Sequence, residues 1–269
     1  MSTPQNNAFS PDPHIDNELN LDNIPMTYCV AIRTRQGLVF LADTRTNAGV
    51  DHISKVKKLF TWQSPGERII TMMTSGNLGM TQAVISELNE DIERGTSDNG
   101  PTILTADSLF DVAQIVGEKM RVVQQRYGAG LAARGIDSGA NIIIGGQKLG
   151  AQPRLFLVYA AGNFIEALDD SPFFQTGEHK YGKPIIDRVI TVETELEDAK
   201  ICALLSMDST LRSNLTVGMP LDLAVVRADT FQFEQLRRIE ADNMAFREFS
   251  ERWSQELRNA FSVMRGMYV

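Results

Sequence analysis

Two short apolar runs near the start of the chain indicate consecutive strands. The run "TYCVAIRT" (27–34) alternates large apolar side chains with smaller or polar ones, which is the two-residue period of a strand. The letters "RQG" supply a tight turn, and "LVFLAD" (38–43) follows as a second strand. We therefore expect the folded part of the chain to begin at Thr27 with two strands joined by a turn.

The rest of the chain alternates blocks of strands with pairs of helices. In chain order, the hydrophobic spacing predicts strands at 57–62 and 67–76, helices with apolar faces from Met80 to Ile92 and from Leu109 to Tyr127, strands at 140–147, 154–160 and 163–168, helices at about 181–189 and 196–205, a strand at 220–228, and an amphipathic helix from about Asn243. This grouping favours stacked layers over a doubly wound sheet. No glycine-rich nucleotide fingerprint follows any of the strands.

Composition and charge indicate a soluble cytoplasmic protein. Of the 269 residues, 43% are hydrophobic and 22% are charged, which are ordinary values for a globular chain. No apolar run approaches the ~20 residues that a membrane-spanning helix needs, so no membrane contact is expected. The net charge is −8, and Lys and Arg form no stripe that could follow a phosphate backbone, which argues against a nucleic-acid partner.

The cysteines and histidines predict neither a disulfide nor a metal site. Cys29 and Cys202 lie in apolar segments without metal-ligand spacing, so we interpret both as reduced core residues. His14, His52 and His179 are scattered along the chain. No metal and no organic cofactor is therefore implied.

The first 26 residues differ in character from the rest. They are rich in Pro, Asn, Asp and Ser, and they carry four acidic residues and no Lys or Arg. Such a segment cannot bury enough apolar surface to offset its ordering entropy, and we predict that it is disordered. Residues 1–26 are interpreted as a leader, a propeptide, a tag or the product of a misassigned start, and residues 27–269 as a single domain.

Three polar residues indicate a catalytic site only when they are considered together. Thr27 opens the first strand, Asp43 ends the second within "LADTRT", and Lys58 lies in "KVKKLF". Singly, they are best explained as a strand former, a turn cap and a solvated lysine. In combination they resemble the proteasome β-type threonine peptidases, which are N-terminal-nucleophile hydrolases. Asp43 follows Thr27 by 16 positions, as in that family, whereas Lys58 falls one residue early.

The longer matches, "TYCVAIRTRQGLVFLADTRTNAGVDHIS" and "MDSTLRSNLTVGMPLDL", resemble the bacterial ancestral β-subunit branch, Anbu. The resemblance implies an α+β fold, a four-layer αββα sandwich of two antiparallel sheets between helical layers. It also implies a nucleophilic hydroxyl at Thr27. A hydroxyl needs a neighbouring base, and a free α-amine, with an ordinary pKa of about 8, can serve as one. Met26 would therefore have to be removed before Thr27 becomes active.

The resemblance assigns further roles by position. Lys58 would place a cation beside Thr27, and Asp43 would hold that ammonium. "TSGNLGM" points to the main-chain N–H of Gly76 as an oxyanion donor. Three further residues, Arg45, Thr46 and Ser75, are expected to bind substrate.

A supporting pair near the Thr27 amine is expected late in the chain. Asp208 fits the acidic member, while Ser209 and Ser213 both fit the serine. A further family serine is not found, and its region holds Thr176 and Glu178.

The predicted function is hydrolysis of peptide bonds in unfolded polypeptides or peptides. The resemblance also implies a homo-oligomer, either a ring or an open helical assembly, since heterologous contacts can give both. One alternative is a catalytically silent structural subunit of the same fold. Another is a small-amide hydrolase with a cysteine nucleophile, for which Cys29 lies two residues late.

Overall fold

The computed structural model describes residues 27–47, 53–95 and 100–267. The predicted leader of residues 1–26 lies outside the described residues, as do His14 and His52. None of the helices in the described part combines the length and the apolar character needed to cross a bilayer.

The first sheet contains the strand that starts beside Thr27. Its order is β10-β1-β2-β11-β12, and every neighbouring pair is antiparallel. The strands are β1 (Tyr28–Thr34), β2 (Gly37–Asp43), β10 (Phe173–Gly177), β11 (Leu221–Arg227) and β12 (Phe233–Ile239). The tight turn predicted between β1 and β2 is confirmed, because Thr34 pairs with Gly37.

The second sheet is also antiparallel and has the order β5-β6-β7-β8-β9. Its strands are β5 (Leu59–Ser64), β6 (Arg68–Gly76), β7 (Ala140–Lys148), β8 (Arg154–Val158) and β9 (Phe164–Glu166). A separate two-stranded ribbon is formed by β3 (Arg45–Asn47) and β4 (Ile53–Lys55). The mixed α+β composition with antiparallel sheets is therefore confirmed.

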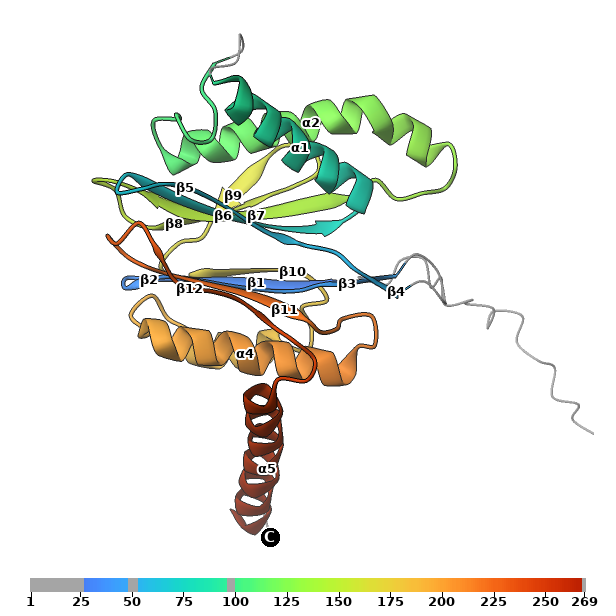
Figure 1. The fold of residues 1–269 in the computed structure, drawn as a ribbon. Coiled ribbons are helices and arrows are strands. Elements are labelled where there is room, and N and C mark those ends of the chain that lie inside the picture. The colour runs from blue at the N-terminus through green and yellow to red at the C-terminus, as the bar shows by residue number, and fades with distance from the viewer. Residues whose placement is uncertain (1–26, 48–52, 96–99, 268–269) are drawn as a thin grey trace, which may run out of the picture.

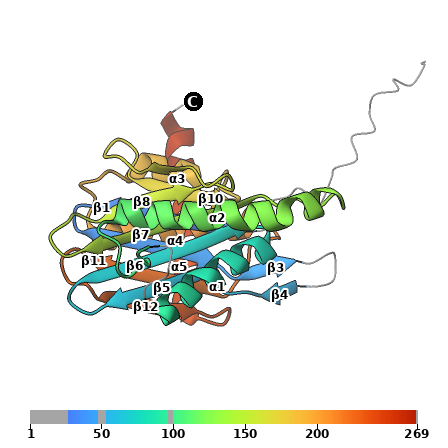
Figure 2. The same cartoon turned by 90° about the horizontal axis from the view of Figure 1, so that it is seen from above.

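Helices cover the outer faces of the two sheets, which face each other (Figure 1). The helices are α1 (Leu78–Arg94), α2 (Leu109–Ala132), α3 (Lys183–Val189), α4 (Leu196–Ser213) and α5 (Met244–Met267). Seen from above, α1 and α2 run across the second sheet (Figure 2). On the opposite side, α4 packs on β1 and β2, and α5 projects away from it (Figure 1).

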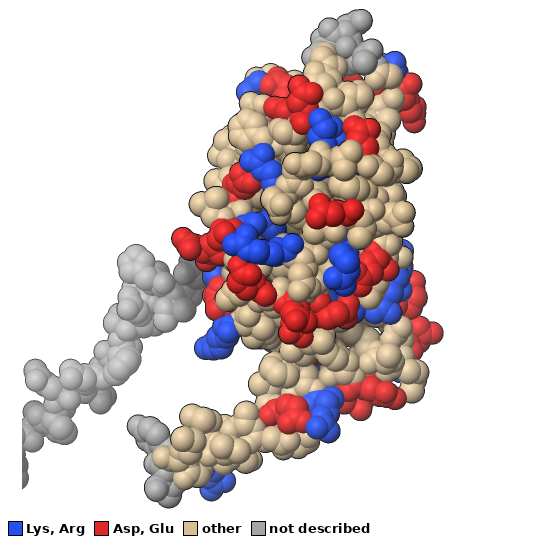
Figure 3. Space-filling view, turned by 90° about the vertical axis from the view of Figure 1, so that its left-hand side faces the viewer, with Lys and Arg blue, Asp and Glu red and all other residues tan. Residues whose placement is uncertain are grey.

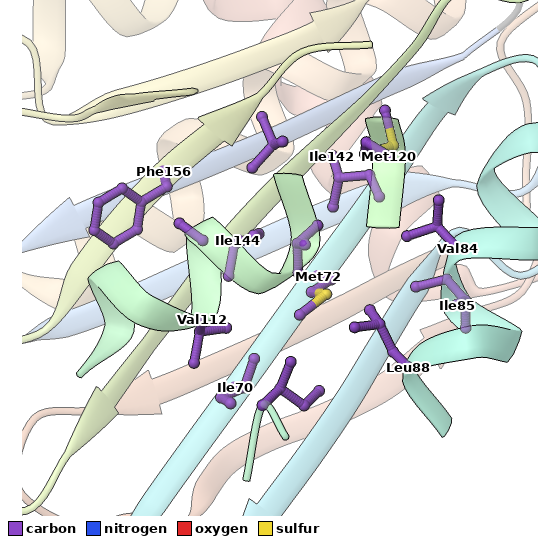
Figure 4. Close-up of a cluster of buried hydrophobic side chains, with 14 of the residues drawn as sticks. Ile70, Met72, Val84, Ile85, Leu88, Val112, Met120, Ile142, Ile144 and Phe156 are labelled. Carbon is purple, nitrogen blue, oxygen red and sulfur yellow. The ribbon is translucent and has the colours of Figure 1, made fainter. Parts of the chain in front are cut away.

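Apolar side chains fill each space between these layers. Figure 4 shows the cluster in which α1 and α2 pack on β6, β7 and β8, with Met72 and Ile144 among its members. A second cluster lies between α4 and the first sheet and includes Val30. A third lies between the sheets and includes Cys29 and Phe40. Because β1 is covered on both faces, its polar and apolar residues alternate less clearly than in a half-exposed strand.

Candidate active site

The start of β1 is fixed to the end of β2 by a buried carboxylate. Cys29 pairs with Ala42 across the two strands, so Thr27 and Tyr28 lie beside Asp43. The Tyr28 N–H donates to Asp43 Oδ1 at 3.0 Å. Thr27 is 8% exposed and Asp43 is fully buried. The structure thus brings together the first two residues of the predicted catalytic set.

The third predicted residue, Lys58, completes an ion pair at this point. Its main-chain carbonyl accepts from the Thr74 N–H at 3.0 Å, which attaches the segment before β5 to the end of β6. Its Nζ donates to Asp43 Oδ1 and to the Arg45 carbonyl, each at 2.6 Å. Lys58 is only 5% exposed. The one-residue difference in spacing therefore does not prevent Lys58 from reaching Asp43.

Asp43 has more partners than the lysine alone. Its Oδ2 accepts from the Arg45 N–H and the Gly218 N–H, each at 3.2 Å. Burial raises the pKa of the Asp43 carboxyl, and the Lys58 ammonium and the main-chain donors oppose this rise. Buried charges are tolerated in proteins when they are paired and hydrogen-bonded, and Asp43 is both. The carboxylate consequently fixes four segments around Thr27.

The end of β10 holds Thr27 from the other side. The Glu178 N–H donates to the Thr27 carbonyl at 2.7 Å. Gly177 has a φ of +81°, and a Cβ on it would lie 1.8 Å from the Thr27 carbonyl oxygen. Only glycine allows β10 to approach β1 this closely.

The end of β6 reaches the same place from the second sheet. The Cys29 thiol lies 3.8 Å from the Thr74 carbonyl, and Ser75 Oγ lies 2.5 Å from Thr176 Oγ1. Gly76 follows with a φ of +88°, where a Cβ would lie 2.2 Å from the Gly139 carbonyl oxygen. Ser75 and Gly76 are therefore at the same end of the two sheets as Thr27, and Ser75 is bonded to Thr176.

Comparison with solved structures identifies the family. An Anbu (Gly-1) mutant from Hyphomicrobium sp. strain MC1 is 51% identical, with a TM-score of 0.80 over 88% of this chain and 97% of that one. The chain belongs to the Anbu family. Anbu is the ancestral β-subunit of the proteasome-like family. The resemblance found in the sequence is thereby confirmed.

Two other Anbu structures agree with this assignment. Anbu from Yersinia bercovieri is 44% identical, with a TM-score of 0.81 over 88% of this chain and 97% of that one. A helical assembly of the Anbu complex from Pseudomonas aeruginosa is 45% identical, with a TM-score of 0.82 over 88% and 96% of the two chains. No family model and no curated protein matches the chain.

Asp208 and Ser209 lie elsewhere in this Anbu chain. Both are on α4, which continues to Ser213 instead of ending near residue 205. Asp208 Oδ1 accepts from Ser250 Oγ on α5 at 2.5 Å, and Oδ2 accepts from Arg212 Nε at 3.3 Å. These bonds join α4 to α5, and the structure does not bring Asp208 into the Asp43–Lys58 group. Ser213, the alternative serine, is exposed at the end of α4.

The loop after α4 supplies polar groups that the sequence reasoning missed. Asn214 Nδ2 donates to Glu178 Oε2 at 3.1 Å, and Thr216 Oγ1 donates to Asn214 Oδ1 at 2.7 Å. A signal was present, because the apolar spacing of Leu204, Met207 and Leu211 extends the helical period past residue 205. That extension makes Asn214 the first residue of the loop.

The three residues expected to bind substrate all have other contacts here, and the bond between Ser75 and Thr176 is one of them. Arg45 Nη1 donates to the Leu215 carbonyl at 2.7 Å, and its side chain lies against Gly218, where a Cβ would be 2.2 Å from Nε. Arg45 thus supports the loop after α4. Thr46 is half-buried in β3, opposite Ser54 of β4. Their roles toward a substrate remain predictions.

Cys29 does not have the properties of a nucleophile. It is fully buried, and burial raises the pKa of its thiol, against the opposing effect of the Lys58 ammonium. Within the described ranges, no three His, Cys, Asp or Glu side chains are arranged to hold a metal ion. His179 is exposed after β10, with Nδ1 3.2 Å from the Gly177 carbonyl.

Proposed function

We propose that this chain is a threonine-type endopeptidase of the proteasome-like family that uses the Thr27 hydroxyl as its nucleophile. The buried Asp43–Lys58 ion pair beside Thr27 is the observation that carries the proposal. Burying two charges is costly, and a structural protein can fill the same space with apolar side chains. At the first residue of a strand, such a pair is best explained by a need for a fixed positive charge.

The proposed first step forms an ester with the substrate. The free α-amine of Thr27 takes the hydroxyl proton, directly or through a water molecule, while Oγ1 attacks the peptide carbonyl carbon. Lys58 has three N–H donors, and two of them bind Asp43 and Arg45. We assign the third to the Thr27 hydroxyl oxygen, where the ammonium stabilises the charge that develops as the proton leaves.

The remaining steps return the enzyme to its starting state. The Gly76 N–H binds the tetrahedral oxyanion, a donor that contributes about 3 kcal/mol in comparable sites. The C–N bond breaks as the proton passes from the amine to the leaving group. Water then attacks the ester, the Thr27 amine takes and returns its proton, and the C–O bond to Thr27 breaks. Asp208 and Ser209 are left without a role in these steps.

The mechanism requires removal of Met26. A peptide nitrogen is not a base near neutral pH, so Thr27 bonded to Met26 is inactive. Residues 1–26 are, in this proposal, a leader or a misassigned start, and residues 27–269 form one domain with the four-layer αββα sandwich of the N-terminal-nucleophile hydrolases. The enzyme would act on unfolded polypeptides or peptides in the cytoplasm.

Self-assembly through α5 belongs to the same proposal. Phe246 and Phe249 of this helix pack against the cluster on α4, but Leu257, Phe261 and Met264 are 49%, 69% and 61% exposed. These three residues are spaced to form one stripe along the helix. Figure 3 shows the projecting end of α5 with few charged side chains. A second copy of the chain is the partner that we assign to this stripe, in line with the helical assembly of a 45% identical relative.

A catalytically silent assembly subunit is the second candidate. The placement of Asp208 favours it, because the carboxylate is held by α5 and its own helix instead of lying beside Thr27. The two candidate functions predict different N-terminal residues for the mature chain. The enzyme needs Thr27 at its N-terminus, whereas a silent subunit functions with residues 1–26 retained.

Mass spectrometry of the protein purified from its native cell tests the proposal. We expect a chain that begins at Thr27 and that gains the mass of an epoxyketone inhibitor on that residue, with loss of peptide hydrolysis. Thr27→Ala is the matched control and should gain no mass. A chain that retains residues 1–26, binds no inhibitor and still assembles would establish the silent subunit instead.

A further inference from the structure

Glu178 is the direct neighbour of Thr27 across the first sheet. β1 and β10 pair antiparallel with Tyr28 opposite Gly177 and Cys29 opposite Thr176, so the next pair in the same register is Thr27 with Glu178. The Glu178 N–H bond to the Thr27 carbonyl extends the ladder by this pair. Side chains of directly opposed residues lie on the same face, with Cβ atoms about 5 Å apart.

That face is the one that looks toward the second sheet. Cys29, two residues from Thr27, packs in the cluster between the sheets. Thr176, two residues from Glu178, bonds Ser75 of the second sheet. The two-residue period of β1 turns Thr27 in this direction. Glu178 follows Gly177, whose φ is +81°, so its own hydrogen bonds and not the strand period place its side chain.

The Glu178 carboxylate is buried, with 4% of the residue exposed. Its Oε2 accepts from Asn214 Nδ2 at 3.1 Å and its Oε1 from the Lys180 N–H at 3.3 Å. Lys180 Nζ lies 3.9 Å away, on a side chain that is 72% exposed, so this ion pair is screened by solvent. A buried carboxylate with so weak a cationic partner favours a second positive group nearby.

We propose that Glu178, held in place by Asn214, is a positioning residue that orients the Thr27 α-amine and stabilises its ammonium form. This inference rests on the proposed function, because the amine exists only once Met26 has been removed. The carboxylate then has a partner that the uncleaved chain cannot offer. Asn214 and Thr216 fix the side chain of Glu178 without adding charge.

Charged groups of opposite effect surround the amine. The Lys58 ammonium favours the neutral amine, and the Glu178 carboxylate favours the protonated amine. Asp43 is paired with Lys58, and Arg45 is directed to the Leu215 carbonyl. Glu178 therefore counteracts the lysine and raises the pKa of the amine.

His179 and Lys180 complete the groups on this side of the site. Both follow β10 directly, and His179 has its Nδ1 on the Gly177 carbonyl. Both residues are exposed, so solvent weakens their influence on the amine. A general base is most effective when its pKa lies near the working pH. The opposing effects of the Lys58 ammonium and the Glu178 carboxylate keep the pKa of the Thr27 amine in that range.

Glu178→Gln tests the inference, since glutamine keeps the size of the side chain and its acceptor for Asn214. Competitive acetylation of the α-amine across pH, read by mass spectrometry of the N-terminal peptide, measures the pKa of the amine in the mature protein. We expect this pKa to fall by about one unit, the lower end of the shift that a neighbouring charge produces. The ascending limb of kcat/KM against pH should move to lower pH by the same amount.

Two further variants separate this role from a structural one. Glu178→Asp keeps the charge and should leave the pKa of the amine above that of Glu178→Gln. Glu90→Gln removes an exposed carboxylate on α1 and should leave the pKa unchanged. An unchanged amine pKa in folded Glu178→Gln, with only a lower Tm or rate, would overturn the inference.

The same measurements distinguish the inference from the proposed function. If the pKa of the amine falls in Glu178→Gln but the mature wild-type protein hydrolyses no peptide, the inference holds and the proposed function fails. If the mature protein retains residues 1–26, both fail, because no amine is present at Thr27.

Discussion

Asp43 and Lys58 depend on each other because neither charge has access to bulk water. Asp43 would keep three main-chain donors without the lysine, but its charge would be unpaired. Breaking a buried ion pair by removing one partner typically costs about 3–5 kcal/mol. At the scale of single residues, this pair therefore serves stability and the proposed chemistry together.

Lys58→Ala should abolish most peptide hydrolysis and lower the free energy of unfolding by about 3–5 kcal/mol. Hydrolysis of a fluorogenic peptide and urea unfolding are the two measurements. Lys57→Ala is the matched control, because the neighbouring lysine is exposed, with its Nζ 5.3 Å from the centre of the Phe60 ring. Wild-type turnover in folded Lys58→Ala would remove the lysine from the mechanism.

Cys29 should be chemically inert in the folded protein. Burial raises the pKa of its thiol above the ordinary value of about 8.5, so the neutral form is favoured in the fold. The stability that this protonated thiol contributes is therefore fully present below the ordinary pKa. It is lost as pH rises from that value through the raised pKa of the folded state. Iodoacetamide at pH 8.5 should leave Cys29 unmodified in the native protein and alkylate it in urea, as read by mass spectrometry.

A matched variant addresses the amidase alternative. Cys29→Ala should retain peptide hydrolysis, because the proposed mechanism uses the Thr27 hydroxyl and not the thiol. Loss of hydrolysis in a folded Cys29→Ala, together with alkylation of native Cys29, would favour a cysteine nucleophile.

The resemblance to a known family predicted which residues meet at Asp43 but not what surrounds them. Thr27, Asp43 and Lys58 were predictable because their order and offsets resemble those of the proteasome β-type peptidases. Glu178 and Asn214 were not assigned roles. Their side chains meet because the end of β10 lies against the loop after α4, and no local sequence pattern predicts a contact between segments so far apart in the chain. The structure places Asp208 within α4, which extends beyond residue 205, and bonds it to Ser250 of α5.

At the scale of elements, the strands that were missed are short or lie at sheet edges. β12 carries three charged residues among its seven and pairs only with β11, so it lacks a clear apolar pattern. β10 is a five-residue strand that is half-buried except at Thr176. β3 and β4 have three residues each. The longer apolar strands were predicted within a few residues of their bounds, whereas the end of α4 was predicted near residue 205 and lies at Ser213.

The exposed stripe on α5 gives a prediction about assembly. Burying one large apolar side chain contributes about 1.5–3 kcal/mol, which is roughly tenfold to a hundredfold in a dissociation constant. Leu257→Asp and Phe261→Asp should therefore shift the particle toward single chains, as measured by mass photometry or sedimentation, with an unchanged monomer fold. Asn259→Asp, at an exposed polar position of the same helix, is the control.

An unchanged particle size in both apolar variants would exclude the stripe as the contact between copies. A loss of helical signal in either variant would instead indicate that α5 itself had unfolded. Circular dichroism of the same samples separates these outcomes, because α5 is a long helix whose loss is measurable.

At the scale of the whole molecule, the site lies where two sheets from distant parts of the chain meet. β1, β2 and β10 contribute from the first sheet, and the end of β6 contributes from the second. Stacked layers were predictable from the grouping of strands and helices, and the family resemblance implied the α+β fold class. The contact between the two sheet ends was not predictable, since it joins Ser75 to Thr176 and the Cys29 thiol to the Thr74 carbonyl, which are far apart along the chain.

The position of β1 between β10 and β2 has a consequence for activation. From Tyr28 onward the strand is bonded to β2 on one side and β10 on the other, and the Thr27 carbonyl is itself held by Glu178. Cutting the chain just ahead of Thr27 releases none of these bonds. Maturation would then break one peptide bond, between Met26 and Thr27, in a sheet that is already formed. Its rate would depend on how easily the processing enzyme reaches that bond and not on a rearrangement of the sheet.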